Sequence, residues 1–129
     1  QISAFWDLMP TILDLVGQPI PGGIDGEILK GNLESAEYRL KRETLYWEFP
    51  AYGGQQAVRW QNWKAIRPNL VGKSPSLKLE LYNLANDPAE SKDVAADHPE
   101  VVEKMKQWMT ELRTPSSRFP IPILDKIAR

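Results

Sequence analysis

The chain of 129 residues is long enough for one hydrophobic core, and its 42% apolar and 26% charged residues are ordinary for a globular domain. Sixteen basic and 17 acidic residues give a formal net charge of −1, which offers no electrostatic reason to expect nucleic acid or an anionic membrane as a partner. The chain has no cysteine and one histidine, which excludes disulfides, a cysteine nucleophile and a multi-histidine metal site. No apolar run approaches the roughly 18 residues of a membrane span.

The first predicted element is a short helix over residues 7–16. Asp7 is placed to cap its first turn, Pro10 falls early enough to be tolerated, and Gly17 is placed to end it. Apolar residues lie nearly all the way round this helix, so we expect it to be buried on more than one side. Because the chain opens on Gln1 in apolar helical sequence, we expect it to be cut from a longer protein that holds the partner of this helix.

Residues 18–42 predict a loop with a turn at Asp25-Gly26, ending in a charged run that is typical of a solvated face. Four strands are predicted after it, over residues 43–49, 56–60, 63–67 and 77–82. Gln61-Asn62 is a plausible two-residue hairpin turn between the second and the third. The fourth alternates leucines with polar residues, which predicts a sheet with one covered face and one wet face.

The clearest helix begins near residue 97, where Asp97 is a candidate N-cap and Glu100 fits a capping box. Its apolar residues form one stripe at helical spacing: Val101, Val102, Met105, Trp108, Met109 and Leu112. We therefore expect an α+β fold in which this helix packs on one face of a four-stranded antiparallel sheet. The tail from Thr114 carries three prolines and predicts an extended strap, with a short helical turn as one option for its end.

Three stretches in this order resemble the sulfatases, arylsulfatase-type hydrolases of the alkaline-phosphatase-like superfamily. Asp7-Leu-Met-Pro-Thr-Ile-Leu-Asp-Leu-Val-Gly17, with Asp25-Gly26 behind it, is similar to the last helix of the large sulfatase domain and the turn that follows. Trp63-Lys-Ala-Ile-Arg67 is similar to a strand of the C-terminal subdomain. Leu81-Tyr-Asn-Leu-Ala-Asn-Asp-Pro-Ala-Glu90 with Asp93-Val-Ala resembles that subdomain's signature, with Asn83 and Asp93 replacing the usual Asp and Asn.

The resemblance implies a domain organisation and an activity. Residues 1–34 would be the last helix and loop of the catalytic domain, and residues 35–129 the C-terminal subdomain. The whole enzyme would be a sulfuric ester hydrolase whose formylglycine nucleophile and calcium ion belong to the missing catalytic domain. We therefore expect no catalytic residue, metal ligand or cofactor in this chain, which would be incompetent alone; Thr114-Pro-Ser-Ser-Arg118 has the wrong register for the nucleophile motif.

The same resemblance implies the partners and the location of the chain. The partners would be its own N-terminal catalytic domain and a sulfated carbohydrate or other sulfate ester. By analogy the protein would be periplasmic or extracellular.

The segment between the first two strands is the candidate substrate contact. Its Gly53-Gly54 pair predicts a mobile loop. We hypothesise that four residues in and after it make outer substrate contacts in the whole enzyme: Tyr52, Gln55, Gln56 and Arg59. An aromatic face, carboxamides and a guanidinium suit a sugar ring with its hydroxyls or sulfate. The alternative is a glycine-rich hairpin or a domain-contact loop.

Other chemistry-bearing residues have plainer interpretations beside the functional ones. A carbohydrate platform of Trp47, Trp60 and Trp63 competes with half-buried sheet packing, which is commoner. We expect His98 at a helix start and not as a catalytic base.

An acidic metal loop at residues 87–93 competes with turn and capping roles, because the spacing lacks the full oxygen set that calcium prefers. Two other functions stay open for the chain, a non-catalytic glycan-binding module and an oligomerisation domain. Independently of these alternatives, we expect a chain cut from the partner of its N-terminal helix to expose that helix and to self-associate through it.

Overall fold

The computed structural model describes residues 2–126 and contains two compact units. They divide between Leu45 and Tyr46, and we call the part up to Leu45 unit 1 and the part from Tyr46 unit 2. Within the described residues, no helix has the length and apolar character needed to cross a membrane.

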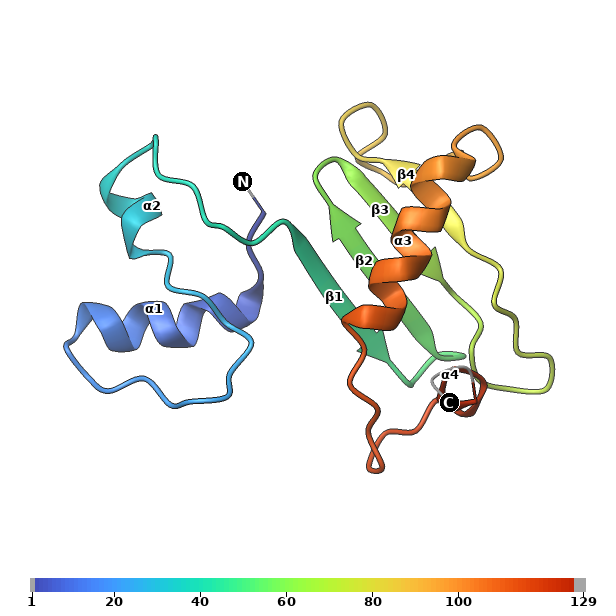
Figure 1. The fold of residues 1–129 in the computed structure, drawn as a ribbon, viewed down its shortest axis with the longest axis horizontal. Coiled ribbons are helices and arrows are strands. Elements are labelled where there is room, and N and C mark those ends of the chain that lie inside the picture. The colour runs from blue at the N-terminus through green and yellow to red at the C-terminus, as the bar shows by residue number, and fades with distance from the viewer. Residues whose placement is uncertain (1, 127–129) are drawn as a thin grey trace. The chain divides into compact units, whose positions relative to one another are not determined.

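The regular elements of unit 1 before residue 44 are helical and are joined by long loops (Figure 1). They are a single 3-10 turn, η1, and two helices: η1 Phe5–Asp7, α1 Leu8–Leu15 and α2 Lys30–Glu34. The predicted end of the first helix is confirmed, because Gly17 has a φ of 68° and its N–H donates to the Asp14 carbonyl at 3.2 Å. The N–H of Gln18 donates to the Leu13 carbonyl at 2.8 Å, which completes a Schellman motif.

Asp7 does not cap α1 as predicted. Helical structure starts at Phe5, so Asp7 already lies inside a turn, and its Oδ2 accepts the N–H of Ala4 at 2.7 Å. Its Oδ1 accepts the N–H of Glu27 at 2.9 Å, and the Arg42 guanidinium binds both carboxylate oxygens, at 2.8 and 2.6 Å. The charged run is therefore not wholly a solvated face, because the Arg42 side chain is only 11% exposed and the Asp7 side chain is fully buried.

The Asp25-Gly26 turn lies against the start of the helical segment. A Cβ on Gly26 would stand 2.2 Å from the Trp6 carbonyl oxygen, so only glycine fits this approach. The Thr11 hydroxyl donates to the Asp7 carbonyl at 2.6 Å and accepts the N–H of Leu29 at 2.8 Å. These contacts fix the loop after α1 by hydrogen bonds.

Most apolar side chains of α1, and that of Val16 at its end, are not covered by the residues that the structure describes. The exposed fractions are 45% for Leu8, 47% for Met9, 56% for Ile12, 52% for Leu15 and 61% for Val16. The burial expected from the apolar pattern of this helix is therefore not met within the described chain.

The sheet has the predicted four strands in the order β1-β2-β3-β4 and is antiparallel: β1 Thr44–Phe49, β2 Gln55–Trp60, β3 Trp63–Arg67 and β4 Glu80–Asn83. Trp60 pairs with Trp63 across the predicted Gln61-Asn62 turn, in which Gln61 has a φ of 52°. β4 begins three residues later than predicted.

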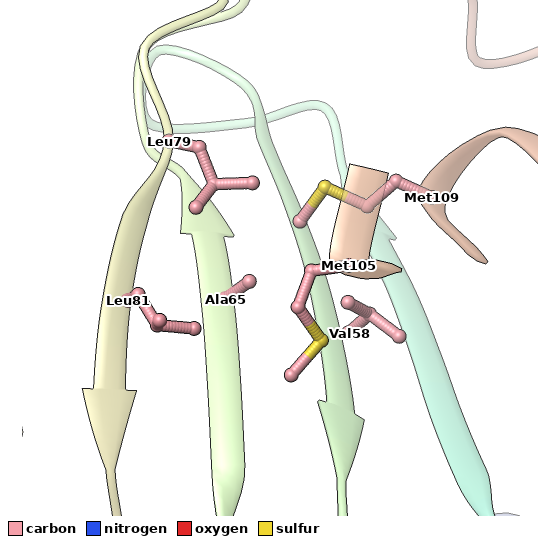
Figure 2. Packing of buried hydrophobic residues seen from close by; sticks show 6 residues of the cluster. All are labelled: Val58, Ala65, Leu79, Leu81, Met105 and Met109. Carbon is pink, nitrogen blue, oxygen red and sulfur yellow. The ribbon is translucent and has the colours of Figure 1, made fainter. Parts of the chain in front are cut away.

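The core of unit 2 lies between the sheet and the long helix α3 (Pro99–Glu111), as Figure 1 shows. Its buried side chains come from three strands, the residue before β4 and the helix: Val58, Ala65, Leu79, Leu81, Met105 and Met109. Figure 2 shows the two methionines projecting toward the strand residues. The expected packing of the helix on one face of the sheet is confirmed.

The start of α3 differs from the prediction. The N-cap is His98 and not Asp97, and no side chain caps the helix. Pro99 occupies the first helical position, where its fixed φ suits a helix start, and proline restricts the residue before it to non-helical conformations. The helix boundary is therefore set by the proline.

The tail after α3 is extended and ends in the short helix α4 (Pro122–Asp125), as the strap prediction allowed. Ile121 and Leu124 pack with Leu70 in a second small cluster.

Candidate functional site

The segment between β1 and β2 is a tight turn over residues 51–54. The Gly54 N–H donates to the Ala51 carbonyl at 3.0 Å, and the two central residues, Tyr52 and Gly53, have φ values of 51° and 87°. Two consecutive positive values are the signature of a type I′ turn, whose twist matches that of a hairpin. Tyrosine is an uncommon residue at this position, because a Cβ disfavours positive φ.

The turn is attached to the chain that follows β3. The N–H of Leu70 donates to the Gly54 carbonyl at 3.0 Å, and the N–H of Val71 donates to the Gly53 carbonyl at 2.7 Å. A Cβ on Gly54 would stand 2.6 Å from Cγ2 of Val71. The glycine pair therefore permits close backbone packing and does not form the free loop that we expected from it.

Tyr52 projects from this turn with 88% of its surface exposed. Its ring stacks on that of Phe49, the last residue of β1, with centroids 6.1 Å apart and planes inclined by 23°. Phe49 is itself 50% exposed. A strained, exposed aromatic residue on a well-attached turn is the kind of feature that concentrates at binding sites.

Two of the other three predicted contacts, Gln56 and Arg59, do not lie together with Tyr52. Gln55 is exposed, but Gln56 is only 1% exposed, because successive residues of a strand point to opposite faces. Arg59 shares the face of Gln55, four residues along β2, which is about 13 Å at the usual rise of a strand. The structure thus brings Tyr52 and Gln55 to one end of β2, with Arg59 toward the other end.

Gln56 does not fit the outer contact predicted for it. Its amide nitrogen donates to the Tyr46 hydroxyl and to the Met109 carbonyl, both at 2.9 Å, and its amide oxygen accepts from Arg67 at 2.9 Å. A side chain with its donors and acceptor paired inside the protein is structural. Period-two alternation could have separated Gln55 from Gln56 in the sequence.

A buried polar network extends from Gln56 toward the C-terminus. The Tyr46 hydroxyl donates to the Glu48 carboxylate, which also accepts Nε of Arg113 at 2.7 Å. A terminal nitrogen of Arg113 donates to Asp125 at 2.6 Å. Burial, and then the bond to Glu48, raise the pKa of Tyr46, so its hydroxyl stays protonated. Burial would lower the pKa of Arg113, but its two carboxylate partners raise it. Arg113 therefore stays charged and forms ion pairs with Glu48 and Asp125.

The tryptophans of the hairpin serve packing. Trp60 and Trp108 lie with ring centroids 5.1 Å apart, and Nζ of Lys104 lies 4.1 Å above the Trp60 ring. Trp63 packs against His98 at 4.8 Å. The sheet-packing interpretation of Trp60 and Trp63 is confirmed, and His98 lies at a helix start as expected.

Two of the three acidic residues in the loop over residues 87–93, Asp87 and Asp93, serve turns and caps as expected, whereas Glu90 pairs with Lys64. The Asp87 carboxylate accepts the N–H groups of Lys92 and Ser91 at 2.9 and 2.8 Å, and these bonds lower its pKa. Asp93 accepts the N–H groups of Leu81 and Ala95 at 3.0 and 2.9 Å. Among the described residues, no group of three or more potential metal ligands occurs.

The face of the sheet opposite α3 carries polar pairs. Nζ of Lys64 binds both Glu90 oxygens, at 2.6 and 2.8 Å. The Tyr82 hydroxyl donates to Glu80 at 2.9 Å; burial, followed by this bond, raises the pKa of Tyr82 to about 12. The predicted covered face is confirmed, whereas the opposite face is polar at these positions but half-buried, and so less open to water than predicted.

Comparison with known proteins places this geometry in a family. The family model described as "N-sulphoglucosamine sulphohydrolase, C-terminal" matches residues 2–115. Arylsulfatase K of Danio rerio is 26% identical over 112 residues, covering 82% of this chain and 21% of that protein. An uncharacterised sulfatase of Schizosaccharomyces pombe is 31% identical over 114 residues, covering 80% and 20%. The chain therefore spans about a fifth of the length of these curated relatives.

Solved structures of sulfatases share the fold. One, described as in complex with its substrate D-glucosamine-2-N,6-O-disulfate, has a TM-score of 0.65 and 24% identity over 82% of this chain and 23% of its own. Another, described as a 2-O GAG sulfatase, has a TM-score of 0.67 and 20% identity, covering 82% and 23%. The family match, the relatives and the fold agree. The chain belongs to the family of sulfatase C-terminal domains that is described as "N-sulphoglucosamine sulphohydrolase, C-terminal".

Proposed function

We propose that this chain is the C-terminal part of a sulfatase, where it completes the fold behind the catalytic domain and borders the substrate cleft. The observation that carries the proposal is the family match over residues 2–115, in a chain that spans about a fifth of its relatives. By the same analogy, we propose a periplasmic or extracellular location.

In this proposal the chain does not cleave sulfate esters alone. Cleavage needs a nucleophile and cations that stabilise the charge developing in the transition state. Asp87 and Asp93 already accept backbone N–H groups, Glu90 binds Lys64, and the Arg113 and Arg42 guanidinium groups bind carboxylates. The formylglycine nucleophile and the calcium ion of the enzyme would therefore lie in the catalytic domain.

The proposed substrate is a sulfated carbohydrate, and Tyr52 with Gln55 would form its outer contact. An exposed aromatic ring can lie against the apolar face of a sugar, and an exposed carboxamide can bond its hydroxyls. Arg59 would reach only a neighbouring unit of a longer chain, given its separation along β2. Gln56 would support the strand from behind through its buried bonds.

Substitution of Tyr52 in the complete protein tests this contact. Tyr52→Asn removes the ring and keeps a residue that tolerates positive φ, whereas Tyr52→Phe keeps the ring. We expect Tyr52→Asn to lower kcat/KM on sulfated carbohydrates by about tenfold, equivalent to about 1.4 kcal/mol, and Tyr52→Phe to have a small effect. A small aryl sulfate serves as the control substrate, because it would not extend to the turn. Unchanged kcat/KM on every sulfated carbohydrate tested would falsify the contact.

The exposed apolar side chains of α1 favour a docking role as well. We propose that they pack against the rest of the same polypeptide, because the relatives are about five times longer than this chain. The isolated chain would then self-associate and the complete protein would not do so through this helix. Sedimentation of the isolated chain, with Ile12→Asp as a comparison, tests this, and a monomeric wild-type fragment would contradict it.

A further inference from the structure

We propose that the C-terminal tail is a clasp that holds the Tyr52 turn, with Ile121, Leu124 and Asp125 as positioning residues. The clasp itself is a statement about structure. Only its consequence for catalysis rests on the proposed function of Tyr52.

The first attachment is apolar. Ile121 is fully buried and Leu124 is 3% exposed, and both pack on Leu70, which is 1% exposed. This cluster is separate from the core beneath α3. The backbone N–H of Leu70 donates to the Gly54 carbonyl of the turn. Leu70 therefore contacts the tail through its side chain and binds the turn through its backbone N–H.

The second attachment is ionic and lies on the other side of the turn. The Arg113 side chain is 4% exposed and joins Glu48, in the last part of β1, to Asp125 in α4. Figure 1 shows α4 beside the end of the sheet where β1 leads into β2. The tail is thus fastened both to the strand that enters the turn and to the segment that pairs with it.

The turn needs such support. Tyrosine at a φ of 51° is strained, because its Cβ disfavours positive φ, and such strain persists only where surrounding contacts over-determine it. The family match ends at residue 115, whereas the contacts of Ile121, Leu124 and Asp125 come from beyond it. The tail therefore adds support from outside the matched domain to a turn that lies inside it.

Amide hydrogen exchange on the complete protein tests the clasp directly. In Leu124→Ala, we expect the amides of Leu70 and Val71, which donate to the turn, to exchange at least tenfold faster than in the wild type. The amide of Ala65, in the centre of β3, should keep its wild-type rate. Asp125→Asn, which weakens the ionic attachment without leaving a cavity, should act in the same direction by a smaller factor. Phe119→Ala is the matched control, because Phe119 is a large apolar tail residue that is 59% exposed.

Two outcomes would overturn the clasp: no acceleration at Leu70 and Val71, or equal acceleration at Ala65, which would make the tail a general stabiliser of unit 2. Kinetics separate the inference from the proposed function. Local acceleration with a raised KM for sulfated carbohydrate and an unchanged kcat would support both. Faster amide exchange at Leu70 and Val71 with unchanged kcat and KM, together with an unchanged kcat/KM of Tyr52→Asn, would uphold the clasp and reject the substrate contact.

Discussion

The two units of the chain are held by different kinds of interaction. Unit 2 buries six apolar side chains between α3 and the sheet. The helical segments of unit 1 bury a carboxylate, a hydroxyl and a proline: Asp7, Thr11 and Pro10. Four apolar residues of α1 (Leu8, Met9, Ile12 and Leu15) and Val16 at its end are between 45% and 61% exposed.

This contrast shows where each unit obtains its stability. Apolar burial is the main favourable term in folding, so unit 2 has a driving force of its own. Unit 1 is ordered by hydrogen bonds and ion pairs, which are specific in geometry but contribute little net free energy on their own. A unit with polar order and uncovered apolar side chains is expected to depend on further protein for its stability.

The largest effect is expected from removing Arg42, the cation that pairs with Asp7 in unit 1. Arg42→Ala leaves the buried Asp7 carboxylate without its partner, so unit 1 should lose about 3–5 kcal/mol. Exchange of the Glu27 amide, which donates to Asp7, reports the opening of unit 1. Arg39→Ala is the control, because the Arg39 side chain is exposed and bonds only nearby carbonyls. Equal effects of the two substitutions would show that the ion pair does not organise the unit.

One chemical change made in both units sharpens the comparison. Met105→Ala creates a cavity in the core of unit 2 and should cost about 2–5 kcal/mol. Met9→Ala makes the same change in α1, where the side chain is 47% exposed, and should stay within about 0.5 kcal/mol in the isolated chain at concentrations low enough to keep it monomeric. Urea denaturation measures both values. A large loss from Met9→Ala in the isolated chain would mean that α1 is covered after all.

Acid should loosen unit 1 before unit 2. Burial alone would raise the pKa of Asp7, but the bonds from Arg42 and from the N–H groups of Glu27 and Ala4 outweigh it and lower the pKa to about 2. Asp7 therefore stabilises the folded state fully above its ordinary pKa of 3.8, and this contribution of about 2 kcal/mol is lost as the pH falls from about 4 to about 2. Amide exchange at Glu27 across this range checks the sign, and Asp7→Asn should flatten the dependence.

The smallest expected effect concerns the end of α1. Gly17→Ala places a Cβ at a φ of 68° and should cost about 1 kcal/mol. Gly22→Ala is a matched control, because an added Cβ meets nothing within 4 Å at either glycine and only Gly17 has a positive φ. Thermal unfolding of the two variants should therefore differ by the backbone term alone.

Sequence patterns predicted the features that depend on near neighbours. The stop at Gly17, the Gln61-Asn62 turn and the apolar stripe of α3 each follow from residues within one or two turns of chain. The antiparallel pairing of β2 with β3 followed from the predicted two-residue turn between them.

The interactions that sequence reasoning missed join residues far apart in the chain. Asp7 meets Arg42 across 35 residues, and Arg113 meets Glu48 across 65. No local periodicity marks such pairs, so Asp7 was assigned the nearest plausible role, a helix cap. For Gln56 the signal was present, because alternation along a strand assigns it and Gln55 to opposite faces. The backbone hydrogen bonds that Gly53 and Gly54 accept from residues 71 and 70 likewise join segments that are distant in the sequence.

The paired rings of Trp60 and Trp108 provide an optical marker of this architecture. One ring comes from the sheet and the other from α3, and at 5.1 Å and 55° their electronic transitions couple. Such coupling gives a circular dichroism couplet that exists only while the helix lies on the sheet. Since the pair belongs entirely to unit 2, its signal would follow the docking of α3 without a contribution from the helices of unit 1.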